Sequence, residues 1–124
     1  MTFSEEIKQH ALSLGFDACG ICRAEESEQE AHYRSWLSEE CHAGMDYLER
    51  NIDKRMDPRL MVEGARSIIS VALNYFPHRF QHEDAPQFAY YAYGEDYHDI
   101  VKEKLSRLFD FIKLRFPGVS GRYF

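Results

Sequence analysis

The chain has 124 residues, of which 44% are hydrophobic and 15% aromatic, enough apolar area for one ordinary domain with its own core. Its net charge of -6 is unlike that of a free-standing nucleic-acid-binding domain, so we expect no DNA partner. The longest apolar run, residues 68–73, is far shorter than the roughly 18 residues of a membrane span, and three cysteines do not suggest a disulfide framework. No secretory signal precedes Ser4, so we expect a cytoplasmic protein.

The first part of the chain predicts a helix, a strand and further helices. Thr2 and Glu5 have the spacing of a capping box, in which each side chain accepts a backbone N–H of the other residue. An apolar face follows, and Gly15 stands where a left-handed residue would end the helix. A short apolar run bounded by polar residues then predicts a strand at 16–22, and apolar residues in helical register predict a helix at 28–40, followed by a short helix at 45–50.

The middle of the chain predicts one strong strand. Residues 51–56 show no clear periodicity, whereas Asp57-Pro58 is typical of a cap with proline at the first position of a helical turn. Residues 67–75 are apolar almost without alternation, a pattern that suits a central strand covered on both faces.

The last part predicts a charged loop at 78–86, a short strand at 87–91 and a long amphipathic helix capped by Asp96. Pro117-Gly118 should stop this helix, and 119–124 should begin another strand. Because that strand would be cut short, we expect the chain to be the N-terminal piece of a longer protein. The expected fold is α/β, with helices flanking a small mixed sheet.

Residues 92–98 are the densest cluster of special side chains. Tyr75, Tyr91, Tyr93 and Tyr97 either form a wall for a planar ligand or belong in part to the core. His98, one turn into the helix, is a structural residue, a metal ligand, a proton donor or a hydrogen-bonding clamp. Ligands of such sheets bind beyond the carboxyl ends of strands, where Tyr75 and this stretch should lie.

Two other patterns are less specific. Cys19 and Cys22 form a C-x-x-C, but inside a predicted strand and without a second pair, so we interpret them as small core residues. Residues 50–66 hold five cations against three carboxylates, which suits either a phosphate grip or a solvated loop with internal ion pairs.

The order of the motifs resembles the N-terminal domain of epoxyqueuosine reductase over essentially the whole chain. The most specific blocks are 53–59 and 91–98. The motifs that carry the resemblance are Phe16-Asp17, Gly20-Ile21, Trp36-Leu37, Gly44-Met45-Asp46-Tyr47-Leu48, Asp53-Lys54-Arg55, Asp57-Pro58-Arg59, Gly64-Ala65-Arg66-Ser67, Leu73-Asn74-Tyr75, Ala92-Tyr93-Gly94 and Asp96-Tyr97-His98.

This resemblance implies a reductase that converts epoxyqueuosine to queuosine in tRNA. It implies cobalamin held largely by the N-terminal domain, iron–sulfur clusters held by a domain further along, and a fold similar to the cobalamin-binding parts of reductive dehalogenases. Residues 1–124 would be that cobalamin-binding domain, truncated before the aspartate proton donor and the cluster cysteines. The fragment should therefore hold no catalytic residue and no metal ligand, and be inactive alone. Ala89-Tyr90 departs from a Ser-Arg pair of many relatives.

The residues and the resemblance together predict the site. The expected cobalamin-binding residues are Arg55, Tyr75, Tyr91, Tyr93, Gly94, Asp96, Tyr97 and His98, and the expected phosphate or tRNA contacts are Lys54 and Arg59. Open coordination suits a reactive cobalt, so we do not expect His98 to be an axial ligand. The alternative is a non-catalytic module, for a flavin-like cofactor or a protein partner, on the same scaffold.

Overall fold

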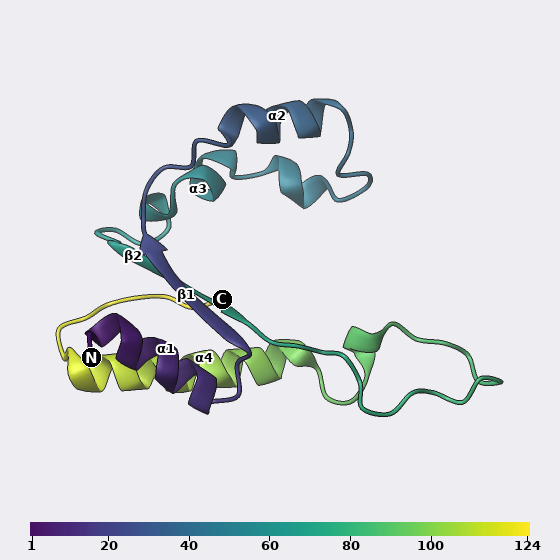
Figure 1. The fold of residues 1–124 in the computed structure, drawn as a ribbon. Helices are drawn as coiled ribbons and strands as arrows, with labels where there is room; N and C mark the ends of the chain where they lie inside the picture. Colours follow the sequence, from purple (N-terminus) through teal and green to yellow (C-terminus); the bar gives the residue numbers. More distant parts are fainter. The chain divides into compact units, whose positions relative to one another are not determined.

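The computed structural model describes all 124 residues, which divide into two compact units (Figure 1). The first unit comprises Met1–Ile21 and Ile69–Phe124, and the second comprises Cys22–Ile68. No helix is both long enough and apolar enough to cross a membrane. In chain order the helices and strands are α1 (Phe3–Ser13), β1 (Ala18–Arg23), α2 (Glu30–Ser38), η1 (Asp46–Glu49), α3 (Ile52–Met56), η2 (Pro58–Leu60), β2 (Ser67–Ala72), η3 (Tyr90–Ala92) and α4 (Tyr97–Arg115), where η marks a 3₁₀ helix.

The core of the first unit lies between α1 and α4, which run side by side (Figure 1). Side chains spaced four apart on each helix meet there, since residues i and i+4 share a helix face. The buried cluster is Ile7, Ala11, Phe16, Leu108 and Ile112. Burying a side chain of the size of Ile or Leu contributes about 1.5–3 kcal/mol, so this cluster is the main support of the unit.

The start and the end of α1 confirm the local predictions. The Thr2 hydroxyl accepts from the Glu5 N–H at 3.3 Å, and a Glu5 carboxylate oxygen accepts from the Thr2 N–H at 2.6 Å. Gly15 follows the helix with φ +92°, the left-handed conformation that favours glycine. The Lys104 ammonium on α4 donates to the Leu14 carbonyl at 2.8 Å, which joins the end of α1 to α4.

Replacing Gly15 with alanine should lower the free energy of unfolding by about 1–2 kcal/mol, because a β-carbon is strained in the left-handed region. The new methyl group would also meet the Lys104 ammonium and disturb its bond to Leu14. Thermal or urea unfolding measures the change. Gly20→Ala is the matched control, because nothing lies within 4 Å of a β-carbon there, and it should change stability by less than about 1 kcal/mol. Equal effects of the two substitutions would contradict the assignment.

The sheet consists of β1 and β2 alone. The Asp17 N–H donates to the Ala72 carbonyl at 2.8 Å, and the Ala24 N–H donates to the Arg66 carbonyl at 3.0 Å. The start of one strand thus pairs with the end of the other, so the strands are antiparallel. The prediction of a mixed sheet was wrong in this respect, although the combination of helices and strands is confirmed.

The prediction that the second strand is covered on both faces was also wrong. No residue of β2 is fully buried, and only Ile69, Val71 and the following Leu73 pack against the core. These three residues alternate along the chain, as expected when one face of a strand is covered. Ala72 and Ile68 are themselves apolar and hide this alternation in the sequence.

The second unit is the chain between the two strands. Its best-buried hydrophobic side chains are Ala24 and Met56, and the Ser27 N–H donates to the Met56 carbonyl at 2.7 Å. Asp57 caps η2 and Pro58 is its first residue, as predicted. Helix α3 was not predicted, because five residues are too few to show a helical period.

Two predicted strands are absent from the structure. Residues 87–91 lead into η3, and the Phe88 N–H is bonded by the Gln81 side chain at 2.7 Å rather than by a neighbouring strand. Residues 119–124 form no strand, and Tyr123 instead lies against Phe109 of α4, with the ring centroids 6.1 Å apart. A strand needs a partner backbone, and the two-stranded sheet pairs with neither segment.

Candidate functional site: a tyrosine-lined cleft at the start of the long helix

A cleft of about 320 Å³ lies in the first unit where β2, η3 and α4 meet. Its lining is Leu73, Tyr75, Tyr91, Tyr97 and Val101. Leu73 and Tyr75 are two residues apart in the extended chain after β2, which puts both on one side of the backbone. Tyr97 and Val101 are one helical turn apart at the start of α4 and share a face of that helix.

The three tyrosines of the cleft and the adjacent His98, which lies outside the lining, form a row of four rings. Tyr75 meets Tyr91 at 6.5 Å and Tyr91 meets Tyr97 at 6.0 Å, both with ring planes near 87°. Tyr97 is stacked on His98 at 4.1 Å. Edge-to-face pairs of this kind are favoured by the ring quadrupoles, so each ring holds its neighbour in orientation. We call these four residues the aromatic row.

The three tyrosine hydroxyls of the row are free. Tyr33 and Tyr93, elsewhere in the chain, donate to the Leu48 carbonyl and to Gln81 respectively. Tyr75, Tyr91 and Tyr97 make no such bond, and these residues are 65%, 54% and 42% exposed. The cleft therefore offers apolar ring surface together with hydroxyls that can donate to or accept from a ligand.

Asp96 orients the start of α4 and the His98 ring at once. One carboxylate oxygen accepts from the His98 backbone N–H at 2.9 Å and lies 2.8 Å from His98 Nδ1. Because a carboxylate only accepts, Nδ1 carries the proton, and Nε2 of the neutral ring is left as a hydrogen-bond acceptor. The backbone N–H of His98, and then its ring, lower the pKa of Asp96 below its ordinary value.

This lowered pKa predicts a pH dependence. Folding favours the ionised carboxylate, so the ionised Asp96 adds to the free energy of unfolding at pH values above its unfolded-state pKa. This added stability is lost as the pH falls through the folded-state pKa. An NMR titration of the Asp96 carboxyl carbon should show the lowered pKa directly. In His98→Ala the pKa should rise only part of the way, because the backbone N–H, the larger cause, remains. A full return to the ordinary value would mean that the imidazole dominates.

Of the predicted cofactor-binding residues in the first unit, only Tyr75, Tyr91 and Tyr97 line the cleft, and Tyr93 and Gly94 lie outside the lining, as Asp96 and His98 do. Tyr93 belongs to a second aromatic cluster, formed with Phe76, Phe80 and Tyr90, in which successive rings are 5.6–5.8 Å apart. Gly94 has φ +75° and supplies the left-handed turn that leads into Asp96.

The predicted basic residues belong to the second unit, and two of the three already have partners. Arg55 donates from its guanidinium to the Arg50 and Tyr47 carbonyls at 3.1 and 3.0 Å, which fixes the start of α3. Arg59 forms two 2.8 Å bonds with the Asp57 carboxylate, and this pairing lowers the pKa of Asp57. Lys54 makes no ion pair.

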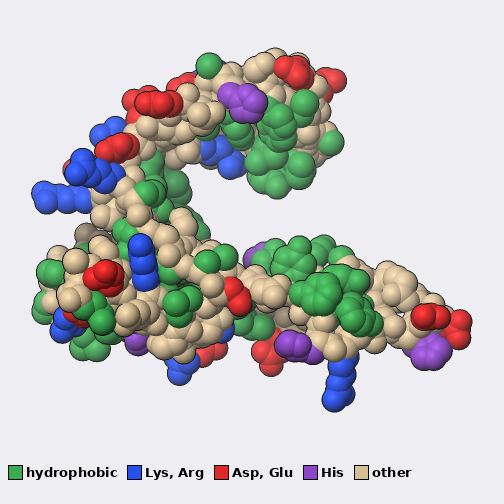
Figure 2. All heavy atoms as spheres, in the orientation of Figure 1, with side chains coloured by type: hydrophobic (Ala, Val, Ile, Leu, Met, Phe, Trp, Pro, Cys, Tyr) green, Lys and Arg blue, Asp and Glu red, His purple; other side chains and the backbone are tan.

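Sequence reasoning missed part of the site. Leu73 belongs to the strand predicted at 67–75 and Val101 to the predicted long helix, and both also line the cleft. Spacing in the sequence could have identified both residues. Leu73 stands two residues before Tyr75 in an extended segment, and Val101 stands four residues after Tyr97 in a helix, so each shares a face with a cleft tyrosine. The second aromatic cluster was also missed, and Figure 2 shows hydrophobic side chains gathered on the surface of this segment after β2.

The C-x-x-C pair does not behave as two core residues. Cys19 packs against the core, and burial raises the pKa of its thiol. Cys22 is exposed, because residues three apart on a strand point to opposite faces. Both thiols are free, as is that of Cys41.

Comparison with known proteins identifies the family. The sequence model described as "Epoxyqueuosine reductase QueG, DUF1730" matches residues 55–124, which include the whole cleft. The epoxyqueuosine reductase of Leadbetterella byssophila is 43% identical over 98% of this chain, and that of Escherichia coli is 32% identical over 98%. The chain covers 41% and 34% of these two proteins, so it spans well under half the length of the curated relatives it matches.

Solved structures agree with the sequence comparison. The epoxyqueuosine reductase of Streptococcus thermophilus superposes with a TM-score of 0.76 at 28% identity, over 95% of this chain and 33% of that one. A crystal structure of an epoxyqueuosine reductase with an epoxyqueuosine-modified tRNA stem loop gives 0.75 at 31% identity, over 91% of this chain and 32% of that one. From the match over 55–124, this chain belongs to the epoxyqueuosine reductase family.

Proposed function

We propose that this chain is the cobalamin-binding part of a reductase that converts epoxyqueuosine to queuosine in tRNA. The observation that carries the proposal is the cleft with three free tyrosine hydroxyls, which lies inside the segment matched by the family model. The relatives are named for the reaction, and one solved relative is bound to a modified tRNA stem loop.

The chemistry of the cleft suits one edge of a corrin. A corrin is a flat ring system with amide side arms. The rings of the aromatic row can pack against the flat ring, and the tyrosine hydroxyls can hydrogen-bond the amide arms. His98 Nε2, left as an acceptor by Asp96, suits an amide N–H. A cleft of about 320 Å³ admits only part of so large a cofactor. When bound, cobalamin would supply the reducing chemistry through its cobalt, and the residues of this chain would bind and orient it.

The remaining parts of the enzyme complete the proposal. Residues 1–124 correspond to the N-terminal cobalamin-binding domain, with a fold akin to the cobalamin-binding parts of reductive dehalogenases. Iron–sulfur clusters and the proton donor belong to a further part of the enzyme. Gly94 and Tyr93 shape the approach to the cleft. Arg55 binds a phosphate group of the cofactor. Lys54 and Arg59 contact phosphate groups, mainly those of the tRNA. Lys54, which has no ion pair, is the most available of these cations.

The test is a titration of the purified chain with hydroxocobalamin, followed by corrin absorbance and by thermal unfolding. Saturable binding should change the absorbance and raise the melting temperature, since a ligand that binds only the folded state stabilises it. Flavin mononucleotide is the comparison ligand. If the flavin binds and cobalamin does not, the chain is a cofactor module of another kind. If neither binds, the cleft is not an autonomous cobalamin site.

A further inference from the structure

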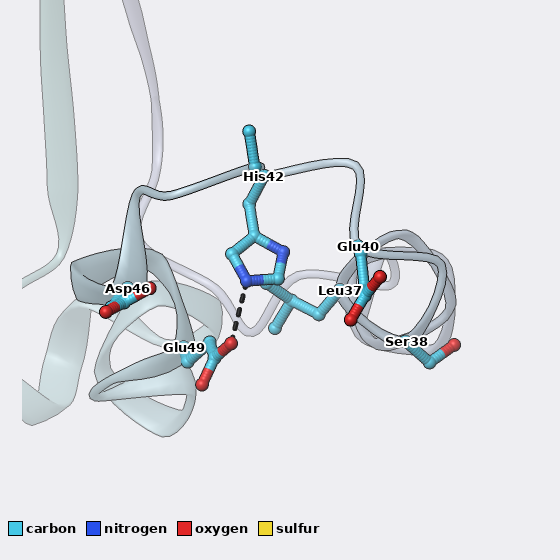
Figure 3. A pocket seen from close by; sticks show the side chains of 7 residues that line it. Leu37, Ser38, Glu40, His42, Asp46 and Glu49 are labelled. Atoms are coloured by element: carbon cyan, nitrogen blue, oxygen red, sulfur yellow. Dashed lines mark hydrogen bonds and ion pairs between the residues drawn. The ribbon is translucent and has the colours of Figure 1, made fainter.

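A second cavity, of about 590 Å³, lies within the second unit, between the end of α2 and η1 (Figure 3). Its lining is Leu37, Ser38, Glu40, His42, Ala43, Asp46 and Glu49. Glu40 and Ala43 adopt left-handed backbone conformations, with φ +56° and +51°, and so turn the chain on both sides of His42. This cavity shares no residue with the tyrosine-lined cleft.

His42 is the buried polar group of this cavity and is only half satisfied. Its side chain is 5% exposed, and Nε2 lies 2.7 Å from a Glu49 carboxylate oxygen (Figure 3). Because the carboxylate only accepts, Nε2 carries the proton, and Nδ1 of the neutral ring presents a lone pair. Nδ1 is buried and has no hydrogen-bond partner. A buried acceptor without a donor is rare in folded proteins, so a missing donor is indicated.

The other polar groups of the cavity are also hydrogen-bond acceptors that have no donor bonded to them. The carboxylates of Glu40 and Asp46 are exposed and form no ion pair, and no lysine or arginine lines the cavity. Ser38 donates its only hydroxyl proton to the Ser35 carbonyl at 2.8 Å, which leaves its oxygen as an acceptor. The cavity thus presents acceptors and negative charge, beside apolar surface from Leu37 and Ala43.

We propose that this cavity binds a guanidinium group. A guanidinium is planar, is always charged, carries several N–H donors that fit carboxylates, and is more weakly hydrated than an ammonium. It would pair with Glu40 and Asp46 and, with a small shift of the His42 ring, donate to Nδ1. A metal ion fits less well, since no three carboxylate, imidazole or thiol groups converge closely enough to coordinate one.

Trp36 makes the test direct. It is the only tryptophan of the chain, and its ring centroid lies 5.8 Å from that of His42. Titration with ethylguanidinium should change Trp36 fluorescence and the ¹⁵N shift of His42 Nδ1 with one dissociation constant, on the order of 1 mM for so small a ligand. Ethylammonium, of the same charge, should bind several-fold more weakly, and urea, planar but neutral, should not bind.

Charge-removing variants decide where binding occurs. Glu40→Gln with Asp46→Asn should weaken ethylguanidinium binding roughly tenfold or more. Glu83→Gln with Asp84→Asn removes the same charge from an exposed loop and should leave binding unchanged. A blocked arginine peptide and free agmatine then distinguish a protein side chain from a free metabolite. Overlapping titrations of ethylguanidinium and urea, or equal effects of the two double variants, would overturn the proposal.

Discussion

Replacing Leu108 with alanine should lower the free energy of unfolding by about 2–5 kcal/mol, because the substitution leaves a cavity between α1 and α4. Leu108 is 3% exposed and packs in the cluster with Ile7, Ala11 and Phe16. In a chain of this size the melting temperature should fall by roughly 10 °C or more. Calorimetry or circular dichroism measures the change.

The matched control lies on the same helix. Leu114 is 81% exposed, so Leu114→Ala should change the free energy of unfolding by less than about 0.5 kcal/mol. Both substitutions alter helix propensity equally, and their difference therefore isolates burial. If Leu114→Ala were as damaging as Leu108→Ala, the core would not lie where the structure has it.

Signals carried by neighbouring residues were read correctly from the sequence. The capping box of Thr2 and Glu5, the left-handed Gly15 and the Asp96 cap of α4 are all confirmed. Each depends on hydrogen bonds or dihedral angles within a few residues, so the sequence contains the whole cause. Pro58 at the start of η2 belongs to the same group.

Signals that depend on distant partners were read less well. The apolar run 67–75 is typical of a central strand, yet its strand has one neighbour and one covered face. Residues 87–91 have strand-like composition, but Gln81 bonds the Phe88 N–H from seven residues away. Strand pairing is set by which backbone is available, and a local pattern does not record that.

The residues predicted for the candidate site also fall into a group that the structure brings together and a residue that it places elsewhere. Tyr75, Tyr91, Tyr97 and His98 were expected to share a ligand, and the structure brings these four together. Tyr93 is only four residues before Tyr97, but its ring packs against Tyr90 of the second aromatic cluster and its hydroxyl donates to Gln81. The family resemblance indicated the segment, but ring directions follow from the turn at Gly94 and the η3 backbone.

The sharpest test of the proposed cobalamin site is the middle ring of the aromatic row. Tyr91 touches both Tyr75 and Tyr97, so Tyr91→Ala removes one contact surface and the support of two others. We expect cobalamin affinity to fall about tenfold or more, given roughly 0.5–1.5 kcal/mol for each aromatic contact. Tyr91→Phe keeps the rings and removes only the hydroxyl, so it should lower affinity by about threefold or less.

The neighbouring residue supplies the control. Tyr90 is 42% exposed and packs with Phe76, Phe80 and Tyr93, outside the cleft lining. Tyr90→Ala removes an equal amount of aromatic surface from the same turn of η3, and should leave cobalamin affinity within about twofold of the unmodified chain. Circular dichroism establishes that both variants fold. Affinity that falls in Tyr90→Ala but not in Tyr91→Ala would place the cofactor on the second aromatic cluster and not on the aromatic row.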